Sequence, residues 1–269
     1  MTISSGRFHS QITSITVEPE DIRSTIIPFR YDTLPGNQPK ANKNIVYLWQ
    51  TNGEEVPFHE DPQRKSMLID SNRADNLTNF DGLSLAKDSY LMAYAVANNV
   101  NAVVTTLIIK GTGDGRFDVS FPEDSLAFSV TQIGSTSLCY HFCVPRGMSP
   151  MDDGDWIGLW EGSTVSELYY KKPLFSSPVL SDINSGYGGL TLPEGQNLMS
   201  GIEYTLGYFK SGYKKKDKKD DKGESKEGDK KDNQAVGGKE EDKKNNQEGG
   251  SKEDPLQTTL AAVTIFTGP

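Results

Sequence analysis

An acidic loop carries the side chains of this sequence that are best suited to binding a metal ion. Asp152, Asp153 and Asp155 lie in one short stretch with Gly154 between them, and Asp182 follows further along the chain. Carboxylate oxygens are the hard ligands that Ca²⁺ takes several of at once. An ordinary Asp- and Gly-rich turn before a strand has the same composition. The sequence therefore allows two interpretations, a calcium site at these four carboxylates or a turn.

A second group of reactive side chains lies in the run from Leu138 to Val144. Cys139, His141 and Cys143 alternate with apolar residues and would share one face of a strand. They have the residue types of a nucleophile–base pair or a zinc site. Same-face neighbours of one strand stand about 7 Å apart and project in parallel, so three of them do not readily converge on one ion. A structural or surface role is the favoured interpretation.

The two cysteines also bear on the compartment. Along a strand, the Cα atoms of Cys139 and Cys143 would be about 13 Å apart, beyond the ~7 Å that a disulfide spans. We therefore expect free thiols and a reducing, cytoplasmic location. The N-terminal residues contain no apolar run of signal-peptide length, and export without a cleaved signal peptide is the alternative.

Motifs of the common enzyme classes are not found in the sequence. None of the three histidines, His9, His59 and His141, stands in a pattern that would hold it between a nucleophile and an orienting carboxylate. The Gly-rich run 111–115 follows one expected strand and opens another, whereas a phosphate-binding loop opens a helix. We therefore expect a protein that is not an enzyme.

The charge balance disfavours several kinds of partner. The formal net charge is −9, from 28 basic and 37 acidic residues. Such a surface repels nucleic-acid phosphates and anionic lipid headgroups, so we expect no nucleic-acid partner. No apolar run reaches the length of a transmembrane helix, so we expect no membrane span.

Short runs rich in Val, Ile, Thr, Tyr and Phe, separated by Gly, Pro, Asn and Asp, dominate the sequence. This pattern is typical of an all-β sandwich. In the first half we expect strands near residues 12–17, 23–31, 44–50, 66–70, 82–85, 89–97 and 102–110. In the second half we expect them near residues 116–121, 126–132, 136–144, 155–161, 167–170, 178–181, 189–192, 202–210 and 256–267.

The sequence predicts one structural module that occurs twice along the chain. Leu48-Trp49-Gln50 matches Leu159-Trp160-Glu161. Further matched blocks, in the same order, are 19–21 with 122–124, 70–72 with 182–184, 80–85 with 187–192, 90–94 with 204–208 and 103–111 with 260–268. Self-similarity of this kind indicates a repeated structural unit. Trp49 and Trp160 are the predicted core anchors of the two copies.

The stretch Gly154-Asp-Trp-Ile-Gly-Leu-Trp160, which follows a strand ending at Val144, resembles the D-W-I/V-G-L strand of certain immunoglobulin-like β-sandwiches. SKICH domains of cytoplasmic adaptors and the N-terminal domain of plant-type purple acid phosphatases are two examples. The resemblance implies a fold and no functional residue, because the metal-ligand motifs of the phosphatases are missing. The first half departs from the motif, with Asn44 and Ile45 in place of the Asp-Trp pair.

These observations predict two tandem immunoglobulin-like β-sandwich domains, residues 1–111 and 112–269. Residues 213–255 would be an insertion between the last two strands of the second domain, built mainly from Lys, Asp, Glu, Gly, Asn, Gln and Ser. Such a composition cannot bury enough apolar surface to fold, so we expect a disordered spacer. Its loop-closure cost is only about 2 kcal/mol, which a domain can tolerate.

A sandwich that presents loops, without catalytic residues, favours a non-enzymatic binding or adhesion protein. The expected ligand is a protein or a glycan, held by loops at one end of a sandwich as in lectin-like modules. The alternative is a structural protein that self-assembles as a homo-oligomer, in inclusions or filaments, through uncovered strand edges. A toxin-like component is a third interpretation.

Overall fold

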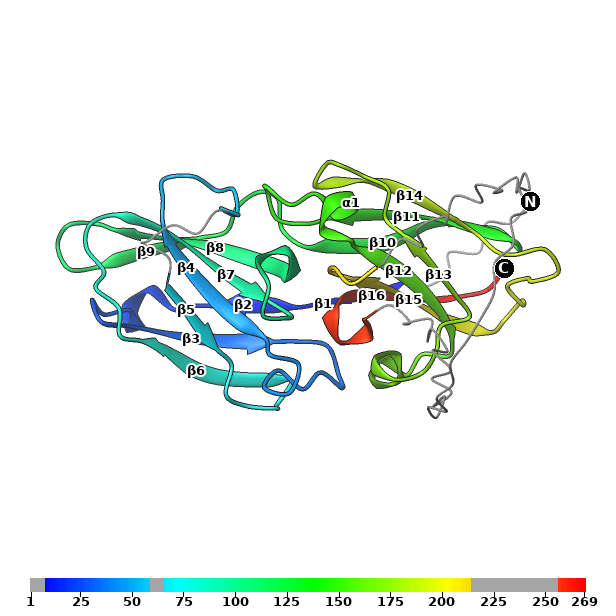
Figure 1. Ribbon diagram of the computed structural model, residues 1–269, viewed down its shortest axis with the longest axis horizontal. Helices are drawn as coiled ribbons and strands as arrows, with labels where there is room; N and C mark the ends of the chain where they lie inside the picture. Colours follow the sequence, from blue (N-terminus) through cyan, green and yellow to red (C-terminus); the bar gives the residue numbers. More distant parts are fainter. Residues whose placement is uncertain (1–7, 59–64, 214–255) are drawn as a thin grey trace, which may run out of the picture. The chain divides into compact units, whose positions relative to one another are not determined.

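The computed structural model describes residues 8–58, 65–213 and 256–269, and this part of the chain is all-β (Figure 1). The first half contains β1 (His9–Ile12), β2 (Ser14–Thr16), η1 (Pro19–Asp21), β3 (Ile26–Asp32), β4 (Ile45–Gln50), β5 (Lys65–Leu68), β6 (Asp75–Asp81), β7 (Ser89–Ala95), η2 (Val100–Ala102) and β8 (Val103–Gly111). The second half contains β9 (Phe117–Ser120), β10 (Ala127–Ile133), β11 (Ser137–Cys143), α1 (Pro150–Asp153), β12 (Trp156–Glu161), η3 (Val165–Tyr169), β13 (Phe175–Pro178), β14 (Ser185–Thr191), β15 (Glu203–Phe209), η4 (Gln257–Thr259) and β16 (Leu260–Thr267). The predicted all-β class is confirmed.

Each sandwich combines a three-stranded and a five-stranded antiparallel sheet. The strand orders are β2-β3-β6 with β5-β4-β7-β8-β9 in the first, and β10-β11-β14 with β1-β16-β15-β12-β13 in the second. Side-chain alternation explains how the three-stranded sheets bury one face, whereas the central strands of the five-stranded sheets are buried on both faces. In β11, Leu138, Tyr140 and Phe142 are buried, whereas Cys139 and His141 on the other face are half-buried.

The two tryptophan strands are paired in matching registers. Trp49 of β4 lies opposite Leu91 of β7, and Trp160 of β12 lies opposite Thr205 of β15. The exposed fractions of the two tryptophans are 0% and 2%. Both are buried, but Trp49 belongs to the large hydrophobic core, whereas Trp160 belongs to a separate smaller cluster with Trp156, Phe209 and Leu168.

Gly158 provides the space that the indole rings of β12 need. A Cβ atom at this position would lie 2.4 Å from the ring of Trp160 and 3.1 Å from the ring of Trp156. The Trp156 ring also stacks on Phe209 of the neighbouring strand, with 3.9 Å between ring centroids. A glycine between two tryptophans on one strand face therefore fits this close ring packing.

The two sandwiches exchange a strand. β1 pairs with β16, from His9 opposite Ile265 to Ile12 opposite Ala262. In the other direction, β9 pairs with β8, the last strand of the first half. The first sandwich thus contains β9 from the second half of the chain, and the second sandwich contains β1 from the first half. The domain boundary between residues 111 and 112 stays a prediction.

Several sequence expectations differ from the structure. The prediction of a strand at 82–85 is wrong, because the strand in this region is β6 and ends at Asp81. The Asp and Asn residues of β6 are typical of turns. Residues 167–169 belong to η3 and form no strand. The match of 80–85 with 187–192 is also wrong, because Phe80 lies opposite Ile27 in β3, and Leu190 holds the corresponding place in β14.

The match of 19–21 with 122–124 is wrong as well. Residues 19–21 follow β2, whereas residues 122–124 precede β10, which is the corresponding first strand of the other three-stranded sheet. Apart from Tyr213, the predicted insertion 213–255 lies outside the described residues, and so does His59. In the described ranges, no helix has both the length and the apolarity needed to cross a membrane.

Candidate functional site

Two places in the described structure have the chemistry of a functional site, a buried acid–lysine cluster and a basic surface pocket. The cluster forms where Asp155 precedes β12 and Lys210 follows β15. These two residues are the next cross-strand neighbours after the Trp156–Phe209 pair. Both side chains have no exposed surface, and Nζ of Lys210 lies 2.7 Å from Oδ2 of Asp155.

The Asp155 carboxylate accepts hydrogen bonds from three directions. The Lys210 ammonium and the Tyr208 hydroxyl each donate to Oδ2 over 2.7 Å, and the Ser211 backbone N–H donates to Oδ1 over 2.9 Å. Burial raises the pKa of Asp155, while Lys210 and these hydrogen bonds oppose the rise. Burial and the adjacent carboxylate also raise the pKa of Tyr208, which therefore acts as a hydrogen-bond donor.

Asp153, the last residue of α1, is the second acid of this cluster. Its Oδ2 lies 3.4 Å from Nζ of Lys210 and accepts the backbone N–H of Ser149 over 3.2 Å. Burial raises the pKa of Asp153 to about 6, and the nearby charge of Asp155 adds to the rise. The side chain is therefore able to exchange a proton near neutral pH.

The structure separates the four carboxylates of the predicted calcium site. Asp153 and Asp155 converge on Lys210, whereas Asp152 is exposed and accepts a hydrogen bond from the Ser149 hydroxyl over 2.9 Å. Asp182 is exposed on the connection between β13 and β14. Within residues 8–58, 65–213 and 256–269, no three His, Cys, Asp or Glu side chains are grouped as metal ligands. The arrangement favours an internal ion pair over a calcium site.

We expect millimolar Ca²⁺ to leave the thermal unfolding midpoint unchanged, because the Lys210 side chain already occupies the position between the two converging carboxyl groups. An ion that binds only the folded protein must raise the midpoint by mass action. Thermal unfolding followed by circular dichroism, with Ca²⁺, Mg²⁺ or EDTA, checks this. A rise with Ca²⁺ that EDTA reverses and Asp153→Asn abolishes would restore the calcium interpretation.

The first half carries an uncharged version of the same cluster. Asn44 precedes β4 as Asp155 precedes β12, and it is fully buried. Its Oδ1 accepts the Tyr94 hydroxyl over 3.0 Å, and its Nδ2 donates to the Val96 carbonyl over 2.6 Å. Val96 thus holds the place of Lys210, and the charge pair occurs in one copy only.

Sequence reasoning missed Lys210 because lysine is almost never fully buried unless it is paired. A signal was present in the sequence. The run Tyr204–Phe209 is nearly all apolar or aromatic, and Lys210 continues it where the first half has Val96. A lysine in an apolar strand position is a reason to look for a buried carboxylate.

The cysteine–histidine face of β11 has no catalytic arrangement. Cys139, His141 and Cys143 are half-buried, and the His141 ring contacts the ring of Tyr187 at a centroid distance of 5.0 Å. Burial raises the pKa of Cys143, and the charge of Asp124 adds to the rise, so its reactive thiolate is disfavoured. Both thiols are free, as predicted.

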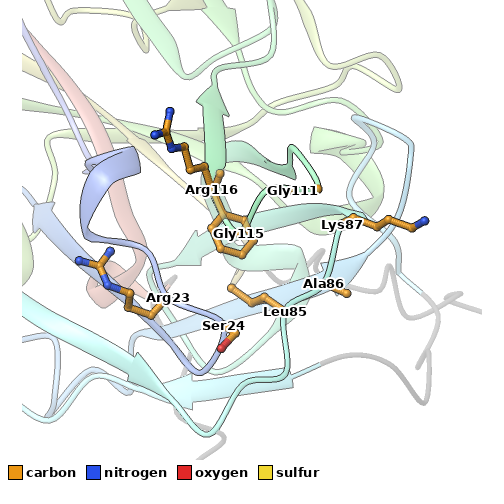
Figure 2. A pocket seen from close by; sticks show the side chains of 10 residues that line it. Arg23, Ser24, Leu85, Ala86, Lys87, Gly111, Gly115 and Arg116 are labelled. Carbon is orange, nitrogen blue, oxygen red and sulfur yellow. The ribbon is translucent and has the colours of Figure 1, made fainter.

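The basic pocket lies at one end of the first sandwich, in a cavity of about 340 Å³. Three connections form it: the one between β2 and β3, the one between β6 and β7, and the turn between β8 and β9. Its floor includes the buried side chains of Leu85 and Phe117. Figure 2 shows Arg23, Lys87 and Arg116 around this floor, each extending outward from the rim.

Two carboxylates lie near the rim of the pocket, those of Glu20 in the adjoining hollow and of Asp114. Arg23 donates to the backbone carbonyls of Glu20 and Ile22, which carry no net charge. Arg116 has an exposed ion pair with Asp114 at 3.7 Å. On a chain of net charge −9, this rim is a local concentration of positive charge above an apolar floor. It suits a ligand with an anionic group and an apolar body.

Comparisons with known proteins leave the function open. No protein-family model matches the chain, and no curated protein matches it either. Among solved structures, the FN1–FN3 domains of chicken CNTN1 are similar, with 12% sequence identity, a TM-score of 0.21, and coverage of 70% of this chain and 55% of that chain. A similarity of this size carries no functional argument. The finer resemblance to SKICH-type and purple-acid-phosphatase domains stays a prediction.

Proposed function

We propose that the chain is a non-enzymatic binding or adhesion module that holds an anionic group of its partner in the basic pocket. The observation that carries this proposal is the cationic rim of Arg23, Lys87 and Arg116 over an apolar floor on an otherwise acidic chain. The pocket is built from loops at a sandwich end, where proteins of this architecture often present binding residues. The partner is a protein or a glycan, met in the cytoplasm or after export without a cleaved signal peptide.

The acidic remainder of the chain narrows the class of partner. Long polyanions such as nucleic acids would be repelled by the net charge of −9 that the whole chain carries. A partner with one or two local anionic groups, such as an acidic peptide segment or a sialylated glycan, meets only the rim. The pocket is also too small for more than a few groups of such a ligand.

We expect acidic probes to bind and their neutral analogues to fail. The probes are a glycan array with acidic and neutral members, and matched peptides that carry Glu or Gln. An exposed charge pair contributes up to about 1 kcal/mol, which is roughly fivefold in affinity. Replacing Arg23, Lys87 and Arg116 together by Ala should therefore weaken binding by about tenfold or more.

Arg30→Ala is the matched control for this experiment. Arg30 is an exposed arginine of the same sandwich that pairs with Asp75, and it does not line the pocket. It should leave affinity unchanged, whereas added salt should weaken binding of the wild-type chain. No bound probe on the array or among the peptides, or equal loss from the control, would refute the proposed site.

Strand exchange favours self-assembly as a second candidate function. Because β1 adds to the edge of β16, the same pairing made between two chains would link them into oligomers. Light scattering across a concentration series tests this candidate. Growth of mass with concentration supports it, and a strict monomer at high concentration excludes it.

A further inference from the structure

The geometry of the buried cluster points to a covalent modification. Nζ of Lys210 and Oδ2 of Asp155 are 2.7 Å apart, and neither side chain has exposed surface. Removing an ammonium and a carboxylate from water is costly, and moving one proton from the ammonium to the carboxylate eliminates both charges. That transfer produces an amine and a carboxylic acid held in contact, which are the two reactants of amide formation.

We propose that Lys210 and Asp155 join in an intramolecular amide bond between the lysine side-chain nitrogen and the aspartate Cγ atom. In the reaction the amine nitrogen attacks Cγ, the C–N bond forms, and the bond from Cγ to the acid hydroxyl breaks. The amine loses one proton and the carboxylic acid loses hydroxide, which leave together as one water molecule. No oxidant, reductant or cofactor is required.

The neighbours of the reacting atoms fit the steps of this reaction. Asp153 lies 3.4 Å from Nζ of Lys210 and can accept the amine proton and deliver a proton to the leaving hydroxyl, so that it ends as it began. The Ser211 N–H, 2.9 Å from Oδ1, is placed to stabilise negative charge on that oxygen in the tetrahedral intermediate. The Tyr208 hydroxyl holds Oδ2 over 2.7 Å. Asp153 has a pKa of about 6 because it is buried, which suits proton exchange at neutral pH.

A short distance between lysine and aspartate is not sufficient for this reaction. Lys40 and Asp70 are as close, with 2.8 Å between Nζ and Oδ1, but both side chains are largely exposed. Water stabilises their charged forms, so the nucleophilic amine and the neutral acid are not both present. The Lys40–Asp70 pair is therefore an internal control of equal distance and opposite burial.

The bond would join the start of β12 to the end of β15. It would fix these neighbouring strands where Tyr213 and Leu256 flank residues 214–255, since Gly212 lies against Leu256. A covalent tie at this point would prevent β12 and β15 from separating at the ends where the long connection leaves the sheet. The inference does not depend on the proposed binding function.

Intact-mass spectrometry of the purified full chain tests the bond without any variant. We expect a mass lower by one water molecule than the sequence requires, also after denaturation. A protease digest should then contain one branched peptide pair linked through Asp155 and Lys210, while the Lys40 and Asp70 peptides stay separate. A wild-type chain of full mass, or a water loss located elsewhere, would overturn the proposal.

Two variants separate the reaction from simple proximity. Lys210→Arg keeps the positive charge but has no amine to acylate, so the full mass should return. Asp153→Asn keeps the Asp155–Lys210 contact, and the linked fraction under matched expression should fall by about tenfold or more, since general acid–base groups contribute about 10²–10⁴ in rate. Circular dichroism confirms that each variant folds. An unchanged linked fraction in folded Asp153→Asn would remove the role given to Asp153.

Discussion

Replacing Lys210 by valine is expected to give a free energy of unfolding about 3–5 kcal/mol below that of the double variant Asp155→Asn with Lys210→Val, because Asp155 then stays buried without a counter-ion. The double variant copies the Asn44–Val96 arrangement of the first half. A buried ion pair is commonly replaced by uncharged residues at little cost. Neither variant can form the amide, so their difference measures the buried charge alone.

Urea unfolding of the two variants, followed by circular dichroism, gives this difference. The loss in Lys210→Val should also depend on pH. Because burial raises the pKa of Asp155 above its ordinary value of 3.8, the penalty is small where the carboxyl is protonated in both folded and unfolded chains, and it grows as pH rises above that value. Equal stability of the single and double variants at neutral pH would mean that Asp155 carries no buried charge.

Trp49→Ala is expected to cost about 3–5 kcal/mol, the usual range for truncating a buried tryptophan. The Trp49 ring has no exposed surface and stacks on Tyr47 with 5.2 Å between ring centroids. Trp160→Ala should cost at least as much, because the indole N–H also donates to the Lys171 carbonyl over 2.7 Å. Both truncations leave a cavity where the indole ring was packed.

Tyr170→Ala is the matched aromatic control, since Tyr170 is 74% exposed. Its free energy of unfolding should change by no more than about 0.5 kcal/mol. Far-UV circular dichroism in urea measures all three variants without relying on tryptophan fluorescence. A small loss in Trp49→Ala, comparable with that of the control, would contradict its assignment as a core anchor.

Local alternation and tryptophan placement made the all-β fold predictable from the sequence. The run from Leu138 to Val144 predicts its buried face directly, because successive side chains of a strand point to opposite sides. β6 was not predictable in the same way, since its Asp and Asn residues are more typical of turns. The pairing of β6 with β3 makes this segment a strand, and its amino-acid composition does not indicate that pairing.

The candidate sites were less predictable than the fold. The acidic loop drew attention to Asp153 and Asp155, but their partner Lys210 lies more than fifty residues later, and only strand pairing brings it to them. The rim of the basic pocket likewise comes from three separate connections. Long-range placement of this kind depends on tertiary packing, which single-residue propensities do not encode.

The pairing of β1 with β16 constrains the order in which the strands can pair during synthesis. During synthesis the strand at His9 leaves the ribosome long before its partner around Ile265 exists. Until β16 has been synthesised, β1 has no strand to pair with. Domains usually form one after another as the chain emerges, but here the second five-stranded sheet can be completed only after β16 has been synthesised. Such distant pairing should make maturation slow.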